Sequence, residues 1–423
     1  MCDARSGSPS ADRQFWYIRL MHPETLILIM AAAVLAPLLA HAAGRWIRVP
    51  LVVFEIVLGI LIGPDVLGWA RPDAVVDTLS HLGLAMLIFL AGYEIDWGAV
   101  RGDTLSRALW AWLVALALGL GVALALTGGE TATAVVIGTA LTSTALGTVL
   151  PVLRDSGDLK GRFGTVMLAF GAVGEFGPII AMALLLSGRR PAESVALLAG
   201  FAVVTAVAVL WALRPRPPWF SRVVRETLHS SGQFAVRFVM LLLVSMLALS
   251  AVFGLDTLLG AFAAGVLTRI VLDRAAPESS GEVVGRIEAI GFGFLVPLFF
   301  VVTGIEFDLA SLLSGGRALA LLPLFLVLFL LVRGVPAALL APRDLGRGDR
   351  RALGLFCATC LPLVVAITTI GLDRGTVTPG ESAALVGAAM VSVLLFPQSA
   401  LRLRAGRGKA PRAALRGEGS EAW

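Results

Sequence analysis

A single carboxylate, Glu175, lies near the middle of an apolar stretch of about 25 residues, Phe163 to Ser187. A stretch of that length spans a bilayer. A charge at that depth is costly and marks an ion path, a proton relay or a counter-ion. Gly174 precedes the carboxylate, and Pro178 frees a backbone carbonyl one turn back. Glu175 is therefore a candidate site for a proton or a cation; the alternative is a structural ion pair with an arginine on another helix.

The apolar stretch 131–154 carries three neighbouring hydroxyl groups at its centre, with Gly147 and Pro151 after them. The hydroxyl groups belong to Thr142, Ser143 and Thr144. Glycine, proline and hydroxyl clusters inside a span are typical of an unwound helix, whose freed carbonyls can bind a cation. The alternative is an unbroken helix in which the hydroxyls bond back onto their own backbone.

A second stretch, 348–372, shows the same combination, with Thr359 and Pro362 at its centre. Arg333 is another intramembrane charge, in the middle of the stretch 317–341. It needs a partner, which is either Glu175 or the partial charges at the ends of the broken helices. Glu55, one turn into an earlier apolar stretch, is a secondary candidate for the ion path or for helix packing.

The composition of the whole chain predicts the kind of fold that must position these groups. Of 423 residues, 57% are hydrophobic and only 15% are charged, and the mean hydropathy is +0.88. Soluble domains are nearer a quarter charged. An all-α polytopic membrane protein is therefore expected, with about thirteen transmembrane helices. The spans are residues 24–43, 50–63, 79–95, 104–127, 131–154, 160–187, 194–213, 233–253, 255–272, 284–304, 317–341, 348–372 and 380–403.

The spans define one transmembrane domain, 24–404, between a short N-terminal extension, 1–23, and a basic tail, 405–423. Met21 is an alternative start to Met1, and the tail is expected to be disordered and too short for a nucleotide-binding domain. The pair Cys357 and Cys360 has no nearby second Cys or His pair, so a metal site is not expected. Neither a cofactor nor enzymatic activity is expected.

The basic residues predict the orientation of the spans. Of the 34 Lys and Arg residues, 25 lie at the loops after odd-numbered spans or in the tail, and eight lie at the N-terminus or at the loops after even-numbered spans. Because cytoplasmic loops are enriched in Lys and Arg, the N-terminus is expected outside and the C-terminus in the cytoplasm, with the protein in the plasma membrane. The net charge of +5 is therefore a signal of topology and not of a nucleic-acid partner.

A short motif, Gly-x-Glu-x-Asp, occurs at 92–96 and again at 304–308, seven spans later. An odd number of spans between the copies means that the two halves run in opposite directions. Inverted repeats are typical of secondary transporters whose site is formed by one broken helix from each half. The alternative is that both copies are acidic helix ends at a membrane interface.

Taken together, these segments resemble the monovalent cation:proton antiporters, in the Kef-type branch of the sodium/proton exchanger superfamily. The resemblance covers nearly the whole chain, from the first span to the last. The segments that carry it are EIVLGILIGP (55–64), LGLAMLIFLAGYEID (82–96), ALTSTALGTVLPVL (140–153), GAFAAGVL (260–267) and IGFGFLVPLFFVVTGIEFD (290–308).

The resemblance implies a scaffold of spans 1–3 and 8–10, a mobile core of spans 4–6 and 11–13, and a homodimer. It places Glu175 at the family's ion-binding carboxylate and Arg333 where the family often has a basic residue. The family commonly has Asp, Asn or Gln before the key carboxylate, whereas this chain has Gly174. Stoichiometry and the choice between Na⁺ and K⁺ therefore stay open.

The expected function is elevator-type exchange of a monovalent cation for protons at Glu175, in which one cation per proton is the simplest count. Two other classes remain open. One is a cation-coupled symporter of an organic solute on the same fold. The other is a membrane sensor that transports nothing, which would have no use for paired helix breaks around a lone carboxylate.

Overall fold

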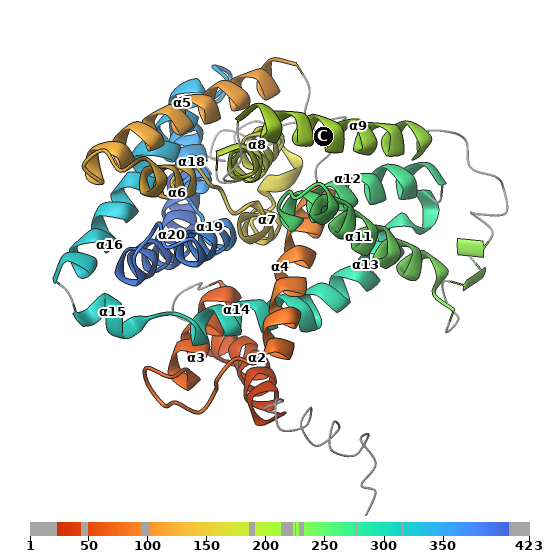
Figure 1. Ribbon diagram of the computed structural model, residues 1–423. Coiled ribbons are helices and arrows are strands. Elements are labelled where there is room, and N and C mark those ends of the chain that lie inside the picture. Colours follow the sequence, from red (N-terminus) through yellow and green to blue (C-terminus); the bar gives the residue numbers. More distant parts are fainter. Residues whose placement is uncertain are drawn as a thin grey trace, which may run out of the picture. The chain divides into compact units, whose positions relative to one another are not determined.

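The computed structural model describes residues 23–43, 50–94, 102–185, 191–212, 223–224, 226–227, 232–275, 277–314 and 316–405. Every regular element in these ranges is helical (Figure 1). Most of the N-terminal extension, much of the stretch 214–232 between the seventh and eighth predicted spans, and nearly all of the tail lie outside them.

The described helices are those of a multi-pass membrane protein. Ten are long and apolar enough to cross a bilayer, and two shorter apolar helices, Leu51–Ile62 and Thr131–Ala140, accompany them. Each of the thirteen predicted spans overlaps one helix or several consecutive helices. By length and composition, ten helices of the described ranges can cross a membrane, so the number thirteen stays a prediction. Because lipid offers no partner for backbone polar groups, apolar segments of this kind satisfy their hydrogen bonds internally as helices.

The chain forms two compact units, each made of segments that are distant in sequence. Unit 1 comprises Met1–Ile95, Ile179–Leu321 and Leu372–Leu385, and unit 2 comprises Asp96–Pro178, Leu322–Gly371 and Val386–Trp423. Four helices contribute residues to both units: α8 (Arg162–Leu185), α16 (Gly316–Leu328), α19 (Pro362–Asp373) and α20 (Pro379–Ala405).

Unit 1 is held together by closely packed apolar helices. Its α4 packs against α12 and α14, and its α3 packs against α14. At Gly59 of α3 the absence of a side chain is required, because a Cβ there would overlap the carbonyl oxygen of Val301. The elements of this unit are α2 (Pro23–Ala43), α3 (Leu51–Ile62), α4 (Ala74–Glu94), α9 (Pro191–Ala212), α11 (Phe234–Val252), α12 (Thr257–Ala275), α13 (Pro277–Ile290), the π-helical η2 (Gly291–Leu295), α14 (Val296–Ile305) and α15 (Leu309–Ser314).

The described residues of both copies of the repeat motif lie at helix ends in unit 1. Glu94 is the last residue of α4, and Glu306 directly follows α14. Asp308 accepts hydrogen bonds from the backbone N–H and the hydroxyl of Ser311, both at 2.6 Å, at the start of α15. Asp96, the last residue of the first copy, lies outside the described residues.

Unit 2 contains the two discontinuous helices. Its elements are α5 (Asp103–Leu126), α6 (Thr131–Ala140), α7 (Leu146–Asp155), the 3-10 turn η1 (Asp158–Lys160), the first part of α8, the π-helical η3 (Phe329–Gly334), α17 (Val335–Leu340), α18 (Arg347–Cys357) and parts of α16, α19 and α20. One helix breaks between α6 and α7, at residues 141–145, and the other between α18 and α19, at residues 358–361.

The first break lies at the hydroxyl cluster itself. Gly147 and Pro151 both lie inside α7, just after the break. In the second break, Thr359 is in the non-helical link, and Pro362 is the first residue of α19. Pro362 thus occupies a helix start, where its missing N–H costs no hydrogen bond.

Candidate functional site

Glu175 lies on α8 within unit 2, with 3% of its surface exposed. Pro178 is inside the same helix and has no N–H to offer to the carbonyl of Gly174, its partner four residues back. That carbonyl instead accepts a hydrogen bond from the backbone N–H of Thr144, at 3.0 Å. The proline beside Glu175 therefore provides the point at which the first helix break attaches to α8.

The hydroxyl groups of the first break are buried. Thr142, Ser143 and Thr144 are each at most 1% exposed. The Thr142 hydroxyl donates to the carbonyl of Thr139, and the Ser143 hydroxyl donates to that of Ala140, both at 2.8 Å. The break and the back-bonding, treated above as alternatives, occur together. Each hydroxyl oxygen keeps acceptor capacity that a proton donor or a cation can use.

Carbonyl groups at the second break accept two hydrogen bonds from the first break. The N–H of Ala145 donates to the carbonyl of Thr359 at 2.8 Å. The Thr144 hydroxyl donates to the carbonyl of Cys357, the last residue of α18, at 2.7 Å. The carbonyls at the end of α18 and in the link after it, which have no partner within that helix, are thus satisfied across the crossing.

Arg333 is fully buried in the π-helical segment η3. Its Nε donates to the Thr144 hydroxyl at 2.9 Å, and its Nη2 donates to the carbonyl of Phe170, on α8, at 2.7 Å. The hydroxyl that it contacts is the one bonded to Cys357, at the negative end of α18. These contacts favour the second role considered above for Arg333, the balancing of partial charges at broken-helix ends.

Gly174 is where α8, Arg333 and the first break meet. A Cβ at this position would overlap both Nη2 of Arg333 and the Thr144 hydroxyl oxygen. Space that a side chain would need beside Glu175 is thus occupied by a guanidinium and a hydroxyl. This accounts for glycine at the position where the resemblance leads one to expect Asp, Asn or Gln.

These residues all belong to unit 2. Glu55, the secondary candidate, lies on α3 of unit 1 and is 3% exposed. Its helix contacts α2 and α14, and none of the described residues of these two helices is a lysine or an arginine. Within the described ranges, no three His, Cys, Asp or Glu side chains gather into a group that could hold a metal ion.

The sequence reasoning missed two residues at this site. The Ser392 hydroxyl of α20 accepts a hydrogen bond from the N–H of Cys360 at 3.2 Å and lies 3.1 Å from the carbonyl of the same residue, which holds the second break. The ring of Trp112, on α5, covers Gly177. No signal in the sequence distinguishes them, because Trp110 lies on the same helix as Trp112, and Ser382 and Ser399 lie on the same helix as Ser392.

Two buried nitrogen donors beside α8 make no hydrogen bond among the described residues. They are Nε1 of Trp112 and Nη1 of Arg333. Their neighbours on α8, Gly177 and Gly174, are three residues apart and so lie on one face of the helix. Both donors thus lie against the same face of α8. Buried donors of this kind take water or a substrate oxygen as a partner.

Comparison with known proteins identifies the family. The model of the sodium/hydrogen exchanger transmembrane family matches residues 27–401. A relative, the putative Na⁺/H⁺ antiporter YjbQ of Bacillus subtilis, is 27% identical over 403 residues, which cover 88% of this chain and 62% of YjbQ. The chain thus spans about three-fifths of the length of that relative. The Na⁺/H⁺ antiporter of Enterococcus hirae is 23% identical over 88% of this chain and 95% of its own length.

The fold is also that of a solved antiporter. The sodium proton antiporter MjNhaP1 from Methanocaldococcus jannaschii matches with a TM-score of 0.66 at 17% identity, over 90% of this chain and 98% of that one. A likeness at this identity concerns the fold alone, while the family match rests on the sequence. The chain belongs to the sodium/hydrogen exchanger transmembrane family.

Proposed function

We propose that the protein is a secondary active transporter that exchanges a monovalent cation, Na⁺ or K⁺, for protons. The observation that carries the proposal is the buried Glu175 beside a crossing of two broken helices, which a backbone hydrogen bond and a bond from the Thr144 hydroxyl join. Relatives add support through their names: YjbQ is a putative Na⁺/H⁺ antiporter, and GerN of Bacillus cereus is an Na⁺/H⁺-K⁺ antiporter.

In this proposal Glu175 binds either a proton or the cation, and never both. Protonation removes the charge of the carboxylate, and a cation balances it with help from oxygens of Thr142, Ser143 and Thr144. An empty carboxylate is expensive to carry through an apolar barrier, so the site crosses only when it is loaded. Arg333 remains charged throughout and is stabilised by carbonyl and hydroxyl oxygens. This rule alone couples the two fluxes, and one carboxylate gives one cation per proton.

The moving part is assigned to unit 2, in an elevator-type exchange of access. Support comes from its composition, since it contains α5–α7, most of α8, η3, α17, α18 and most of α19 and α20 in one compact body. These elements correspond to the predicted core spans 4–6 and 11–13. The working form is a homodimer in the plasma membrane, with the N-terminus outside and the C-terminus in the cytoplasm.

The test is proton flux in proteoliposomes, with Na⁺, K⁺ and Li⁺ offered in turn. In Glu175→Gln, which cannot ionise, we expect cation-dependent proton movement to fall to the level of empty vesicles. Glu278→Gln is the matched control, because Glu278 is exposed in the first turn of α13 and should transport normally when changed. Normal exchange by Glu175→Gln would show that the site is elsewhere.

A further inference from the structure

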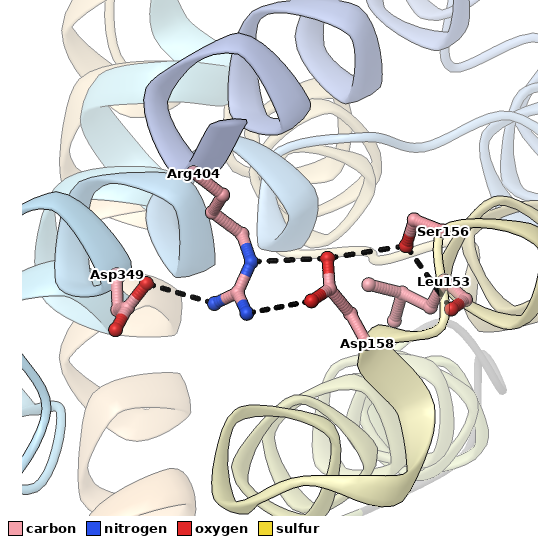
Figure 2. Close-up of polar contacts among 5 residues, drawn as sticks. All are labelled: Leu153, Ser156, Asp158, Asp349 and Arg404. Carbon is pink, nitrogen blue, oxygen red and sulfur yellow. Dashed lines mark hydrogen bonds and ion pairs between the residues drawn. The ribbon is translucent and has the colours of Figure 1, made fainter. Parts of the chain in front are cut away.

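One guanidinium at the end of α20 joins four elements of unit 2. Arg404 donates from Nε and Nη2 to the two carboxylate oxygens of Asp158, at 3.1 and 2.8 Å, and from Nη1 to Asp349 at 2.8 Å. Figure 2 shows the guanidinium between the two carboxylates. Charge-assisted, bidentate contacts of this kind are the stronger hydrogen bonds in proteins and fix geometry as well as energy.

Each partner of Arg404 lies at the end of an element that leads to the candidate site. Asp158 is in η1, which follows α7 and precedes α8, and Asp349 is in the first turn of α18. The Ser156 hydroxyl extends the network to α7, because it lies 3.1 Å from both Asp158 and the carbonyl of Leu153 (Figure 2). The network therefore reaches half of each broken helix and the start of the helix that carries Glu175.

The surroundings make this network stronger than an ordinary surface ion pair. The side chains of Arg404, Asp158 and Asp349 are only 17%, 25% and 26% exposed. The guanidinium carbon also lies 3.7 Å from the ring centre of Phe163, in a cation–π contact. Phe163 in turn packs against Phe356 of α18, with ring centres 6.1 Å apart.

A second ion pair of unit 2 provides a contrast. Arg162, the first residue of α8, donates to Asp344 at 2.7 Å and holds the pKa of that carboxyl below its ordinary value. Both side chains are 52% exposed, so solvent and salt screen the pair, and exposed pairs contribute little. Of the two ion-pair groups that involve the start of α8, the Arg404 network is the one with the burial and geometry to hold it.

We propose that Arg404 is a positioning residue for cation binding: it fixes α7, α8 and α18 at one end, so that Glu175 keeps its alignment with the two helix breaks. The proposal rests on the exchange activity proposed above. The bond from Thr144 to Gly174 is one attachment of α8, and the contact of Arg404 with Phe163 is a second one, about 17 Å away along the helix. A helix held at two points can neither slide nor rotate against its partners.

The two substrates should respond differently to the loss of this second attachment. A cation needs oxygens from several elements at once, so its affinity depends on their alignment. A proton needs only the carboxylate of Glu175. Removing Arg404 should therefore weaken cation binding at every pH by the same factor, whereas a change in proton affinity would make that factor vary with pH.

The experiment measures the KM for Na⁺ and K⁺ in proteoliposomes at several pH values, per amount of folded protein. For Arg404→Gln we expect KM to rise about tenfold, the size of effect seen when groups that orient metal ligands are removed, with Vmax unchanged. In Arg404→Lys the rise in KM should be smaller, because lysine keeps the positive charge but cannot form the bidentate contact of a guanidinium. Asp349→Asn leaves the ion pair between Arg404 and Asp158 in place, so it should raise KM less than Arg404→Gln does. This variant tests the proposal if Arg404→Gln does not fold.

Arg402→Gln is the matched control, since Arg402 is in the same last turn of α20 and is exposed. The double variant Arg404→Gln/Asp158→Asn should be no worse than Arg404→Gln, because both changes remove one contact. An unchanged KM in Arg404→Gln, an equal rise in Arg402→Gln, or a fully additive double variant overturns the positioning role. Absence of exchange in the wild type overturns the proposed function, and the positioning role with it.

Discussion

At the scale of single residues, the candidate site is organised around Thr144. Its backbone N–H, its hydroxyl hydrogen and its hydroxyl oxygen contact Gly174, Cys357 and Arg333, respectively. Sequence reasoning singled out Glu175, Thr144 and Arg333 from residue type and position alone. It could not assign their partners, because these lie up to 213 positions away in the chain and no local pattern encodes them.

Gly174 offers a prediction at this scale. In Gly174→Ala, the new Cβ would overlap the Arg333 guanidinium and the Thr144 hydroxyl, both of which are fully enclosed. We expect a loss of about 1–3 kcal/mol of stability from overpacking and a loss of transport as Arg333 is displaced. Thermal unfolding in detergent and proton flux measure the two effects.

The control for this change is Gly121→Ala on α5, where a Cβ meets nothing within 4 Å. Alanine is the better helix former by about 1 kcal/mol, so this variant should be as stable as the wild type or more so. If Gly174→Ala behaves like Gly121→Ala, the close packing beside Glu175 does not constrain that position.

At the scale of helices, the sequence predicted an all-helical membrane fold because length and hydropathy are local properties. It also found both broken helices, from hydroxyl groups and proline. The exact place of the first break was less predictable: Gly147 and Pro151 lie inside α7, and the chain unwinds before them. The break falls where Thr144 and Ala145 find backbone acceptors in α8 and in the second break. Those acceptors are tertiary features.

The contact between α3 and α14 gives a prediction at the helix scale. In Gly59→Ala, helix propensity would add about 1 kcal/mol of stability, whereas the Cβ would meet the backbone of Val301, which cannot move aside alone. We expect the steric cost to win and the apparent melting temperature to fall. Gly285→Ala on α13, with open space around it, should raise that temperature or leave it unchanged. Equal melting temperatures for the two variants would contradict the close packing at Gly59.

At the scale of the whole molecule, the basic residues predict which loops face the cytoplasm. The orientation can be tested because Cys357 and Cys360 are buried and Cys2 can be replaced by Ser. Arg347 is exposed at the start of α18, beside a predicted cytoplasmic loop, and Glu130 is exposed before α6, in a predicted outside loop. In intact cells, an impermeant maleimide should label Glu130→Cys and leave Arg347→Cys unlabelled.

Inside-out vesicles are the control for this labelling, since they should reverse the pattern. If the maleimide labels Arg347→Cys in intact cells and does not label Glu130→Cys, the protein has the orientation opposite to the predicted one. The charge asymmetry between loops would then have a cause other than membrane topology.

Main-chain atoms alone form one hydrogen bond across the crossing of the broken helices and another from the first break to α8, beside the side-chain bond of the Thr144 hydroxyl. Ala145 contacts Thr359, and Thr144 contacts Gly174, through N–H and carbonyl groups that nearly every amino acid possesses. Mutations that exchange the hydroxyl side chains around this frame leave these bonds intact. The main-chain frame of the site is therefore separable from the hydroxyl groups of Thr142 and Ser143, whose own bonds stay within the first broken helix.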